Sequence, residues 1–204
     1  MTSCTPLRTA SSSATSSTAT RICLPAEAAL RIAKLTQSGC GLFVAHQADT
    51  VEPLRELLGF DEASECWQAI YLKDTPLPVG DFDIRRLDLS YAPFVAEHYN
   101  GPDCLEYMQW QINDGAMLGA FVDGELAGFI GRHDQGALGV LEVLPESRRR
   151  GIATALESAA INRELQEGHV PYCHLYTDNL ASRALQQSLG LSFADKNVWW
   201  LYRK

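Results

Sequence analysis

The sequence predicts an α/β (α+β) fold, with a mixed, mostly antiparallel sheet and helices on both of its faces. Two observations support this prediction. Strand-like and helix-like segments alternate along most of the chain. In addition, residues 116–144 read as three strands joined by tight turns at Asp123-Gly124 and near Gly136, as in an antiparallel meander.

The first third of the chain contains a polar leader and a short strand and helix pattern. Residues 1–24 are rich in Ser, Thr and Ala, so we expect a flexible tail. Arg8 and the lack of acidic residues in its first twenty positions also suit an organelle transit peptide, although regular amphipathic spacing is missing. Residues 74–80 hold two prolines and a glycine and are predicted to be a linker. Between them we expect helices at 26–39 and 51–59 and strands at 40–46 and 66–72.

The remaining two thirds contain the longer elements. Two helices are expected before the meander, the first with Ser90 as N-cap and the second opening near Pro102. A strand, a long helix ending at Gly168, a second strand, a second helix and a last strand complete the pattern. In order, we expect strand 82–89, helices 90–99 and 102–114, the meander, helix 148–168, strand 171–177, helix 179–190 and strand 197–203.

Two distant stretches resemble each other. Gly59 aligns with Gly190 and Tyr71 with Tyr202 at the same shift, and each pair follows a strand and a helix. Either two strand–helix–strand units look alike by chance, or residues 25–73 are a partial copy of the C-terminal half of a main domain at 81–204. The partial copy has no counterpart of the stretch 147–153. We therefore expect it to pack against the main domain and support it, rather than to bind the same ligand.

Composition excludes several classes of protein. The chain has 17 basic and 25 acidic residues and a net charge of −8, which argues against a surface that coats nucleic acid. It has no apolar run of the roughly 18 residues that would predict a membrane span. Its six cysteines form neither a CxxC pair nor a cluster with histidine, so we expect reduced thiols, no metal and a cytoplasmic location.

Three consecutive arginines precede the long helix, which is an unfavourable position for positive charge. The first N–H groups of a helix lack intrahelical partners, and the helix dipole adds partial positive charge there. Gly151 permits close approach to the backbone, and Ala153 is nearly as small. The turn at 148–153 is therefore predicted to bind an anion, with the arginines adding charge-assisted contacts.

The spacing Arg148-x-x-Gly151-x-Ala153 resembles the acyl-CoA loop of the GNAT superfamily of N-acyltransferases. The resemblance covers most of residues 81–204, including the meander and the later "DNLASRALQQSLG". The Asn block and the paired tryptophans look most like the glycine N-acyltransferase-like branch, which also carries a remnant N-terminal half-domain. The implied fold is GNAT-like, with a partial GNAT-like half-domain at 25–73.

The resemblance implies a set of residues that bind acetyl-CoA or another acyl-CoA. Main-chain groups of Leu141 and Val143 would pair with the pantetheine arm as an added strand. The pyrophosphate would lie on the turn, and the facing helix would supply polar side chains. The implied residues are Arg148, Arg149, Arg150, Gly151, Ile152, Ala153 and Thr154 for the turn, and Asn179, Ser182 and Arg183 for the helix.

The catalytic residues depart from the family pattern. Many members have a tyrosine as proton donor seven positions after the Asn, where this chain has Gln186. Some have a glutamate as general base where this chain has Ala137. His174 and Glu142 are the remaining candidates, although strand alternation puts Glu142 on the face opposite Ala137 unless a bulge intervenes. Tyr107, Trp110, Trp199 and Trp200 either line the acceptor site or belong to the core.

The function implied is transfer of an acetyl or other small acyl group from acyl-CoA to a primary amine of a small molecule or amino acid. A protein N-terminus or lysine is a second class of acceptor. The alternative is a CoA-binding regulator or a catalytically silent scaffold, which the missing tyrosine and glutamate would suit. The expected partners are acyl-CoA and a small-molecule amine, with no nucleic acid and no membrane, and a homodimer is left open.

Overall fold

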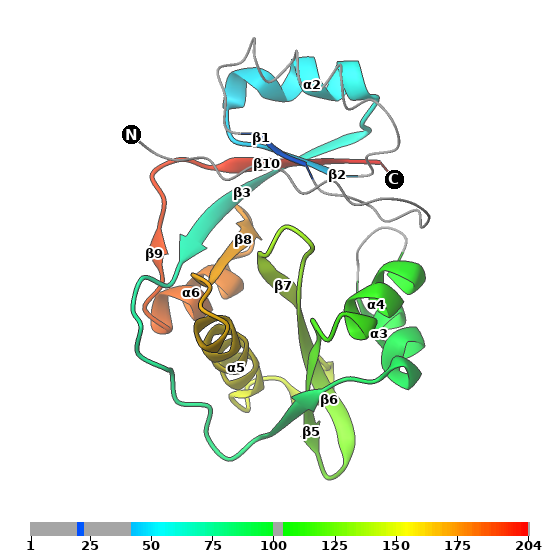
Figure 1. Ribbon diagram of the computed structural model, residues 1–204, viewed down its shortest axis with the longest axis vertical. Helices are drawn as coiled ribbons and strands as arrows, with labels where there is room; N and C mark the ends of the chain where they lie inside the picture. Colours follow the sequence, from blue (N-terminus) through cyan, green and yellow to red (C-terminus); the bar gives the residue numbers. More distant parts are fainter. Residues whose placement is uncertain (1–19, 23–41, 100–103, 204) are drawn as a thin grey trace.

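The protein is described by a computed structural model, which covers residues 20–22, 42–99 and 104–203 (Figure 1). The helices are α2 (Val51–Leu58), α3 (Ala92–His98), α4 (Cys104–Asn113), α5 (Ile152–Gln166) and α6 (Leu180–Ser188). The strands are β1 (Thr20–Ile22), β2 (Leu42–Ala45), β3 (Glu62–Ile70), β4 (Asp83–Arg86), β5 (Leu118–Val122), β6 (Glu125–Arg132), β7 (Leu138–Val143), β8 (Tyr172–Tyr176), β9 (Ser192–Phe193) and β10 (Val198–Tyr202). None of these helices is long and apolar enough to span a bilayer.

All the strands belong to one sheet. Its order is β1-β2-β10-β3-β8-β7-β6-β5-β4, and β9 pairs with β3 outside that path. Two of the pairings in the described chain, β1 with β2 and β7 with β8, are parallel, and the others are antiparallel. The predicted meander is β5–β6–β7, and positive φ angles at Asp123 and Gly124 form its first tight turn. The predicted mixed, mostly antiparallel sheet is confirmed.

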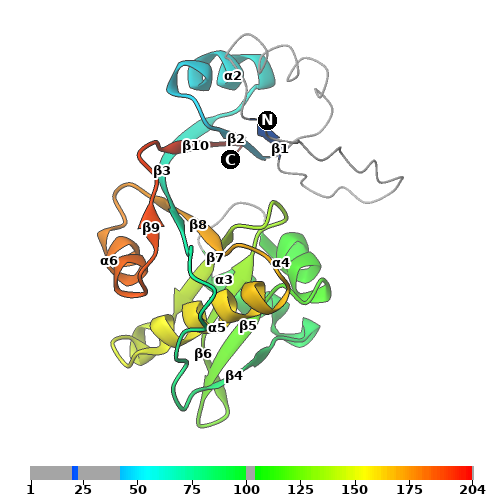
Figure 2. The ribbon, with the colours of Figure 1, turned by 60° about the vertical axis from the view of Figure 1, so that its left-hand side comes forward.

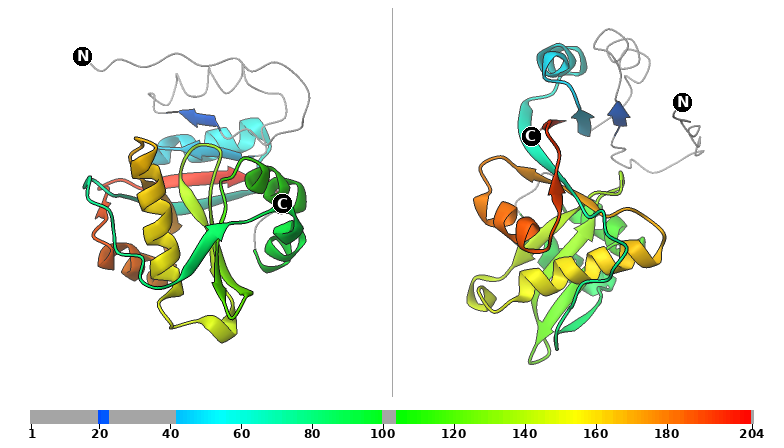
Figure 3. Two further views of the ribbon diagram at one scale, coloured as in Figure 1. Left: turned by 60° about the horizontal axis from the view of Figure 1, so that its bottom comes forward. Right: turned by 90° about the vertical axis from the view of Figure 1, so that its left-hand side faces the viewer.

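Helices cover both faces of the sheet, as the sequence predicts. Figures 1 and 3 show α5 on one face of the meander and α3 with α4 on the other. One core lies under α5 and α6 and includes Leu156 and Ile161. The other lies under α3 and α4 and includes Val95, Met108 and Phe129.

The two strand–helix–strand units noticed in the sequence exchange their last strands. The first unit is β2–α2–β3 and the second is β8–α6–β10, and Gly59 and Gly190 end the helices with φ of 66° and 81°. Strand β3 pairs with β8 of the second unit, and β10 pairs with β2 of the first. Because β3 and β10 also pair with each other, they lie side by side in the middle of the sheet (Figures 1 and 2).

The segments around these units differ from the sequence prediction in detail. Thr20–Ile22, expected in the flexible tail, form a strand that pairs with β2, which offers them its outer edge. The helix expected at 26–39 and the helix start at Pro102 lie outside the described residues. The linker 74–80 has no regular structure, yet it is fixed to α5 because Asn162 exchanges two hydrogen bonds with the backbone of Leu77, at 2.7 and 2.8 Å.

Candidate functional site

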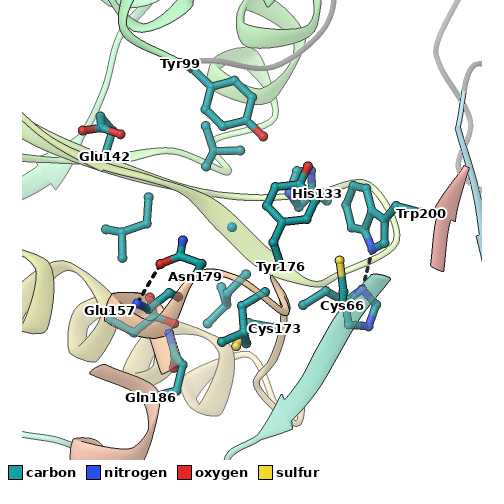
Figure 4. Close-up of a pocket in the computed structure, with 17 residues that line it drawn as sticks. Cys66, Tyr99, His133, Glu142, Glu157, Cys173, Tyr176, Asn179, Gln186 and Trp200 are labelled. Atoms are coloured by element: carbon teal, nitrogen blue, oxygen red, sulfur yellow. Dashed lines mark hydrogen bonds between the residues drawn. The ribbon is translucent and has the colours of Figure 1, made fainter. Parts of the chain in front are cut away.

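A wedge opens between β7 and β8. The two parallel strands pair at one position, Leu138 with Cys173, and then diverge. The space contains a cavity of about 400 Å³ (Figure 4). Its lining residues are Cys66, Tyr99, His133, Leu138, Gly139, Val140, Leu141, Glu142, Glu157, Cys173, His174, Leu175, Tyr176, Asn179, Ser182, Gln186 and Trp200.

A bulge in β7 changes which side chains reach this cavity. Val140 has a φ of 55°, a rare conformation for a β-branched residue. The register between β6 and β7 shifts by one between the pairs Phe129–Glu142 and Gly131–Gly139. The bulge thus breaks the alternation that would have kept Glu142 away from the site, and Glu142 lines the cavity.

The arginine-rich turn leads from this bulged strand into α5. Arg149 and Gly151 have φ of 61° and 86°, and α5 begins at Ile152. Arg149, Arg150 and Gly151 are exposed, whereas the Ile152 side chain is buried and can offer only its backbone. Since the N–H groups of the first helical turn, including Ala153 and Thr154, lack intrahelical acceptors, the turn presents a cluster of outward donors.

Arg148 is directed away from that cluster. Its Nε donates to the Val143 carbonyl at 3.0 Å, and its Nη2 donates to Glu142 Oε1 at 3.0 Å. The side chain therefore lies back along β7 and ties Glu142 to the mouth of the wedge. In this structure, the Glu142 carboxylate pairs with an arginine rather than with another cavity residue.

Helix α6 supplies the opposite wall. Asn179 caps the helix, because its Oδ1 accepts a hydrogen bond from the Ser182 backbone N–H at 3.0 Å. Figure 4 shows the Asn179 amide nitrogen directed into the cavity, and Ser182 lies one turn further. The Arg183 guanidinium stacks over the Trp67 ring, 4.3 Å from its centroid, instead of facing the cavity.

His174 lies on β8 with one ring nitrogen occupied. Trp200 Nε1 donates to His174 Nδ1 at 3.0 Å. An indole N–H can only donate, so Nδ1 carries no proton and neutral His174 carries its proton on Nε2. In this form His174 is a hydrogen-bond donor toward any group that meets Nε2. The structure also brings Trp200 to the cavity, while Trp199 packs in the apolar cluster of the first unit and Trp110 is 38% exposed.

A second histidine, which the sequence analysis did not select, lies on the α4 face. His133 follows β6, and its Nδ1 is 2.6 Å from the Tyr107 hydroxyl of α4. Its ring lies so close to β7 that a Cβ at Gly139 would approach Nε2 to 2.5 Å. Burial lowers the pKa of His133 to about 4, so the ring is neutral near pH 7. Its edge-on contact with Trp200, at 5.0 Å, joins both histidines to one aromatic wall.

Glu157 of α5 is the other residue that the sequence analysis missed. It lines the cavity although only 2% of it is exposed, and burial raises its pKa to about 7 despite a hydrogen bond from Gln186. A signal was present: Glu157, Ala160, Ile161 and Glu164 follow helical spacing and are all buried. Two glutamates on such a stripe need partners or a function.

Comparisons with known proteins agree with this geometry. A family model described as FR47-like protein matches residues 115–200. No curated protein matches the chain in sequence. Among solved structures, a Drosophila protein is 24% identical with a TM-score of 0.64, over 79% of this chain and 60% of that one. This chain thus spans less than two thirds of the length of that protein.

Two further structures carry a family name. A GNAT-family protein of Novosphingobium aromaticivorans is 23% identical with a TM-score of 0.55, over 71% of this chain and 67% of its own. A GNAT-family acetyltransferase of Colwellia psychrerythraea is 18% identical with a TM-score of 0.57, over 87% and 72%. The chain has the fold of GNAT acetyltransferases.

Proposed function

We propose that the protein is an acyl-CoA-dependent N-acyltransferase that moves an acetyl or other small acyl group to a primary amine. One observation carries the proposal. A turn suited to phosphate, at the start of α5, leads into the wedge between β7 and β8, and the wedge closes on buried polar side chains. An acyl thioester on a phosphate-bearing arm fits this arrangement, because its phosphate suits the turn and its thioester would reach the buried polar side chains.

The turn would hold the pyrophosphate of the cofactor. The positive φ angles of Arg149 and Gly151 expose successive backbone N–H groups, and the start of α5 adds those of Ile152, Ala153 and Thr154. Exposed Arg149 and Arg150 would neutralise the phosphate charge, which a protein of net charge −8 otherwise disfavours. Arg148 would flank the same group if the anion drew it from Glu142.

The pantetheine arm would lie between the strands. Beyond Leu138, β8 no longer pairs with β7, so that edge of Leu141 and Val143 is open to an added strand. The Val143 carbonyl already accepts from Arg148, but a carbonyl oxygen has a second lone pair. Asn179 and Ser182 would contact the arm from α6, and Arg183 could leave Trp67 to reach the phosphates.

For proton removal from the amine, we propose Glu142 ahead of His174. His174 Nδ1 is occupied by the Trp200 N–H, so its neutral form donates rather than accepts at the other nitrogen. Glu142 lines the cavity, and it would become an available base when Arg148 turns toward phosphate. A positioned base contributes about 10²- to 10⁴-fold, so Glu142→Gln should slow transfer by at least the lower figure.

The acceptor proposed is a small molecule or an amino acid, and the glycine N-acyltransferase-like branch is the proposed place in the superfamily. The likeness of the units β2–α2–β3 and β8–α6–β10 supports a partial half-domain at 25–73, joined through 74–80 to the catalytic domain at 81–204. We also propose a cytoplasmic location, which the free thiols of Cys66 and Cys173 suit.

Thermal stabilisation by CoA tests the cofactor site. The melting temperature should rise with CoA concentration, as mass action requires. Gly151→Ala should lower the affinity about tenfold or more by adding a Cβ and backbone strain inside the turn. Gly168→Ala is the matched control, because Gly168 also has a positive φ, 77°, but lies beyond the other end of α5. No shift at millimolar CoA would refute the cofactor proposal.

Thiol release from acetyl-CoA and benzoyl-CoA with a panel of amines tests the reaction itself. Transfer to small amines or amino acids should be faster than to peptides with a free N-terminus. Comparing wild type with Glu142→Gln and His174→Ala assigns the base, since the change at Glu142 should have the larger effect on kcat. Equal, unimpaired activity of both variants would reject both residues as bases.

A further inference from the structure

Glu157 is a buried carboxyl without an ionic partner among the residues that the structure describes. Its Oε1 atom has no hydrogen-bond partner there, and none of the ion pairs found in the described chain includes it. Glu164, equally buried on the same helix, is by contrast paired with Arg132 at 3.2 Å. An unpaired buried carboxyl is costly to stability, so its presence beside a cavity points to a ligand.

The carboxyl lies at the closed end of the wedge. Burial, followed by the negative charge of Glu157, raises the pKa of the Cys173 thiol, which places the two side chains close together. Cys173 pairs with Leu138 where β7 and β8 meet. Gln186 reaches the same point from α6: it is 2% exposed, hydrogen-bonds Glu157, and has an Oε1 atom without a partner in the described chain. Figure 4 shows Glu157 and Gln186 side by side.

The two faces of the sheet separate the two chemical tasks. An arm held at the start of α5 and laid between β7 and β8 would bring its reactive end toward Leu138 and Cys173, where the strands pair. Glu157 and Gln186 lie on that face, whereas His133, bonded to Tyr107 of α4, lines the cavity from the other. A leaving sulfur on the face of Glu157 would leave the face of His133 open to the amine.

We propose that Glu157 is the acid that protonates the departing CoA thiolate and that Gln186 positions it; this rests on the proposed acyltransferase function. The amine nitrogen forms a bond to the carbonyl carbon, and the carbon–sulfur bond breaks. The electron pair of that bond goes to sulfur, which takes the proton of Glu157 and leaves as a thiol. The carboxylate then regains a proton, equal to the one that the amine loses on becoming an amide.

The surroundings leave a large fraction of Glu157 protonated near neutral pH. Burial raises its pKa to about 7, and among the described residues no positive charge contributes to this pKa. From β8 it meets the Cys173 thiol, whose own pKa is raised, and from α6 the non-ionising Gln186. The strands packed under α5 contribute Arg132, which is bonded to Glu164, and Glu142 at the mouth, which is bonded to Arg148. Across the cavity stand His133 and His174.

Glu157→Gln and Gln186→Leu test the acid, with Glu56→Gln and Gln187→Leu as controls on exposed residues of α2 and α6. With acetyl-CoA and a reactive amine, Glu157→Gln should lower kcat about 10²-fold and leave CoA affinity unchanged. Wild type should lose activity as pH rises above about 7, because the acid ionises, and Glu157→Gln should lack that limb. Gln186→Leu should shift the pH at which activity is lost, and the controls Glu56→Gln and Gln187→Leu should leave it unchanged.

Two further measurements keep the test decisive. The oxygen ester analogue of acetyl-CoA has a poorer leaving group, so the ratio of wild-type to Glu157→Gln rates should grow with it. Without any acceptor, thiolate absorbance of bound CoA gives the pKa of its thiol, which ionised Glu157 should raise in wild type relative to Glu157→Gln. Equal thiol pKa values or an unchanged high-pH limb would overturn the acid assignment while CoA binding stands. Absence of CoA binding would instead refute the proposed function.

Discussion

The units β2–α2–β3 and β8–α6–β10 have the same order of elements, yet the cavity lies against the helix of the second, and the first contributes to its lining through Cys66 of β3. In the first, Val51 and Leu54 pack with Phe43 and Leu201 into an apolar cluster. At the shift of 131 that aligns the units, Val51 corresponds to Ser182, which faces the wedge. The difference comes from the neighbouring strand: β1 follows β2, whereas β7 leaves β8 after one pair. One scaffold thus gives a closed core or an open site.

Removal of residues 1–78 deletes the first unit and should have the largest effect on the fold. It deletes β3, which lies between β8 and β10, and leaves β10 with neither neighbour. We expect aggregation or loss of the cooperative unfolding transition, because two long edges and the apolar cluster at Leu201 become exposed. Circular dichroism and size-exclusion chromatography measure the outcome. A monomeric fragment with full activity would show that the first unit is an appendage.

Leucines at equivalent positions sharpen the comparison. Leu54 of α2 is 1% exposed, whereas its counterpart Leu185 of α6 is only partly buried beside the cavity. Leu54→Ala should lower the free energy of unfolding by about 2–5 kcal/mol, and Leu185→Ala by clearly less. Chemical denaturation of the two variants gives both values. A larger loss at Leu185 would mean that the second unit is the better packed.

Glu157 of α5, which lines the cavity beside the second unit, makes the stability of the protein depend on pH. Folded Glu157 keeps its proton up to about pH 7, while an unfolded glutamate releases it near 4.5, so its contribution to stability is lost as pH rises between these values. Relative to wild type, Glu157→Gln should therefore gain roughly 3 kcal/mol between pH 4.5 and 7. Denaturation curves across this range measure the gain, and a flat difference would contradict it.

His133 should behave in the opposite sense. Folded His133 stays neutral down to about pH 4, whereas an unfolded histidine is protonated below 6.5, so stability falls as pH falls through this interval. Relative to wild type, His133→Gln should gain stability on acidification. With rising pH, Glu157 lowers the free energy of unfolding and His133 raises it. The two contributions therefore largely cancel in wild type. If the free energies of unfolding of Glu157→Gln and His133→Gln changed with pH in the same direction relative to wild type, this account would be wrong.

The smallest effect is expected from an exchange between the units. Ser182→Val gives the second unit the residue of the first, Val51, at a partly buried wall position. Stability should change by no more than about 0.5 kcal/mol. Affinity for CoA should fall by about three- to tenfold, the cost of one hydrogen bond. Calorimetric titration measures it, with exposed Ser188→Val as control. Unchanged affinity would exclude Ser182 from the site.

The sequence predicts the local elements well, because hydrophobic periodicity and turn residues act over short distances. The meander and its Asp123-Gly124 turn follow from such signals, and so does the long helix, although it begins at Ile152 rather than at the expected Arg148. The strand exchange does not, since periodicity identifies a strand but not its neighbours. The bulge at Val140 runs against the preference of a β-branched residue.

The candidate site divides in the same way. The turn could be predicted because glycine and charge at a helix start carry their meaning locally. Helical spacing places Glu157 on the buried stripe of α5, but its neighbours could not be predicted, because they come from β8 and α6, which close over this position. The occupied nitrogen of His174 depends on Trp200, which reaches it only through the exchanged strand. Tertiary contacts therefore decide the burial and the hydrogen bonding of these side chains.

The position of β10 also has a consequence for synthesis of the chain. Among the described strands it comes last along the chain, yet its pairing partner β2 belongs to the first unit. Closing so long a loop is slow, and until it closes both β2 and β3 have an edge without a neighbouring strand. A nascent chain in this state can accept β10 from another copy. Crowded synthesis should therefore yield strand-swapped dimers as the characteristic misfolded product.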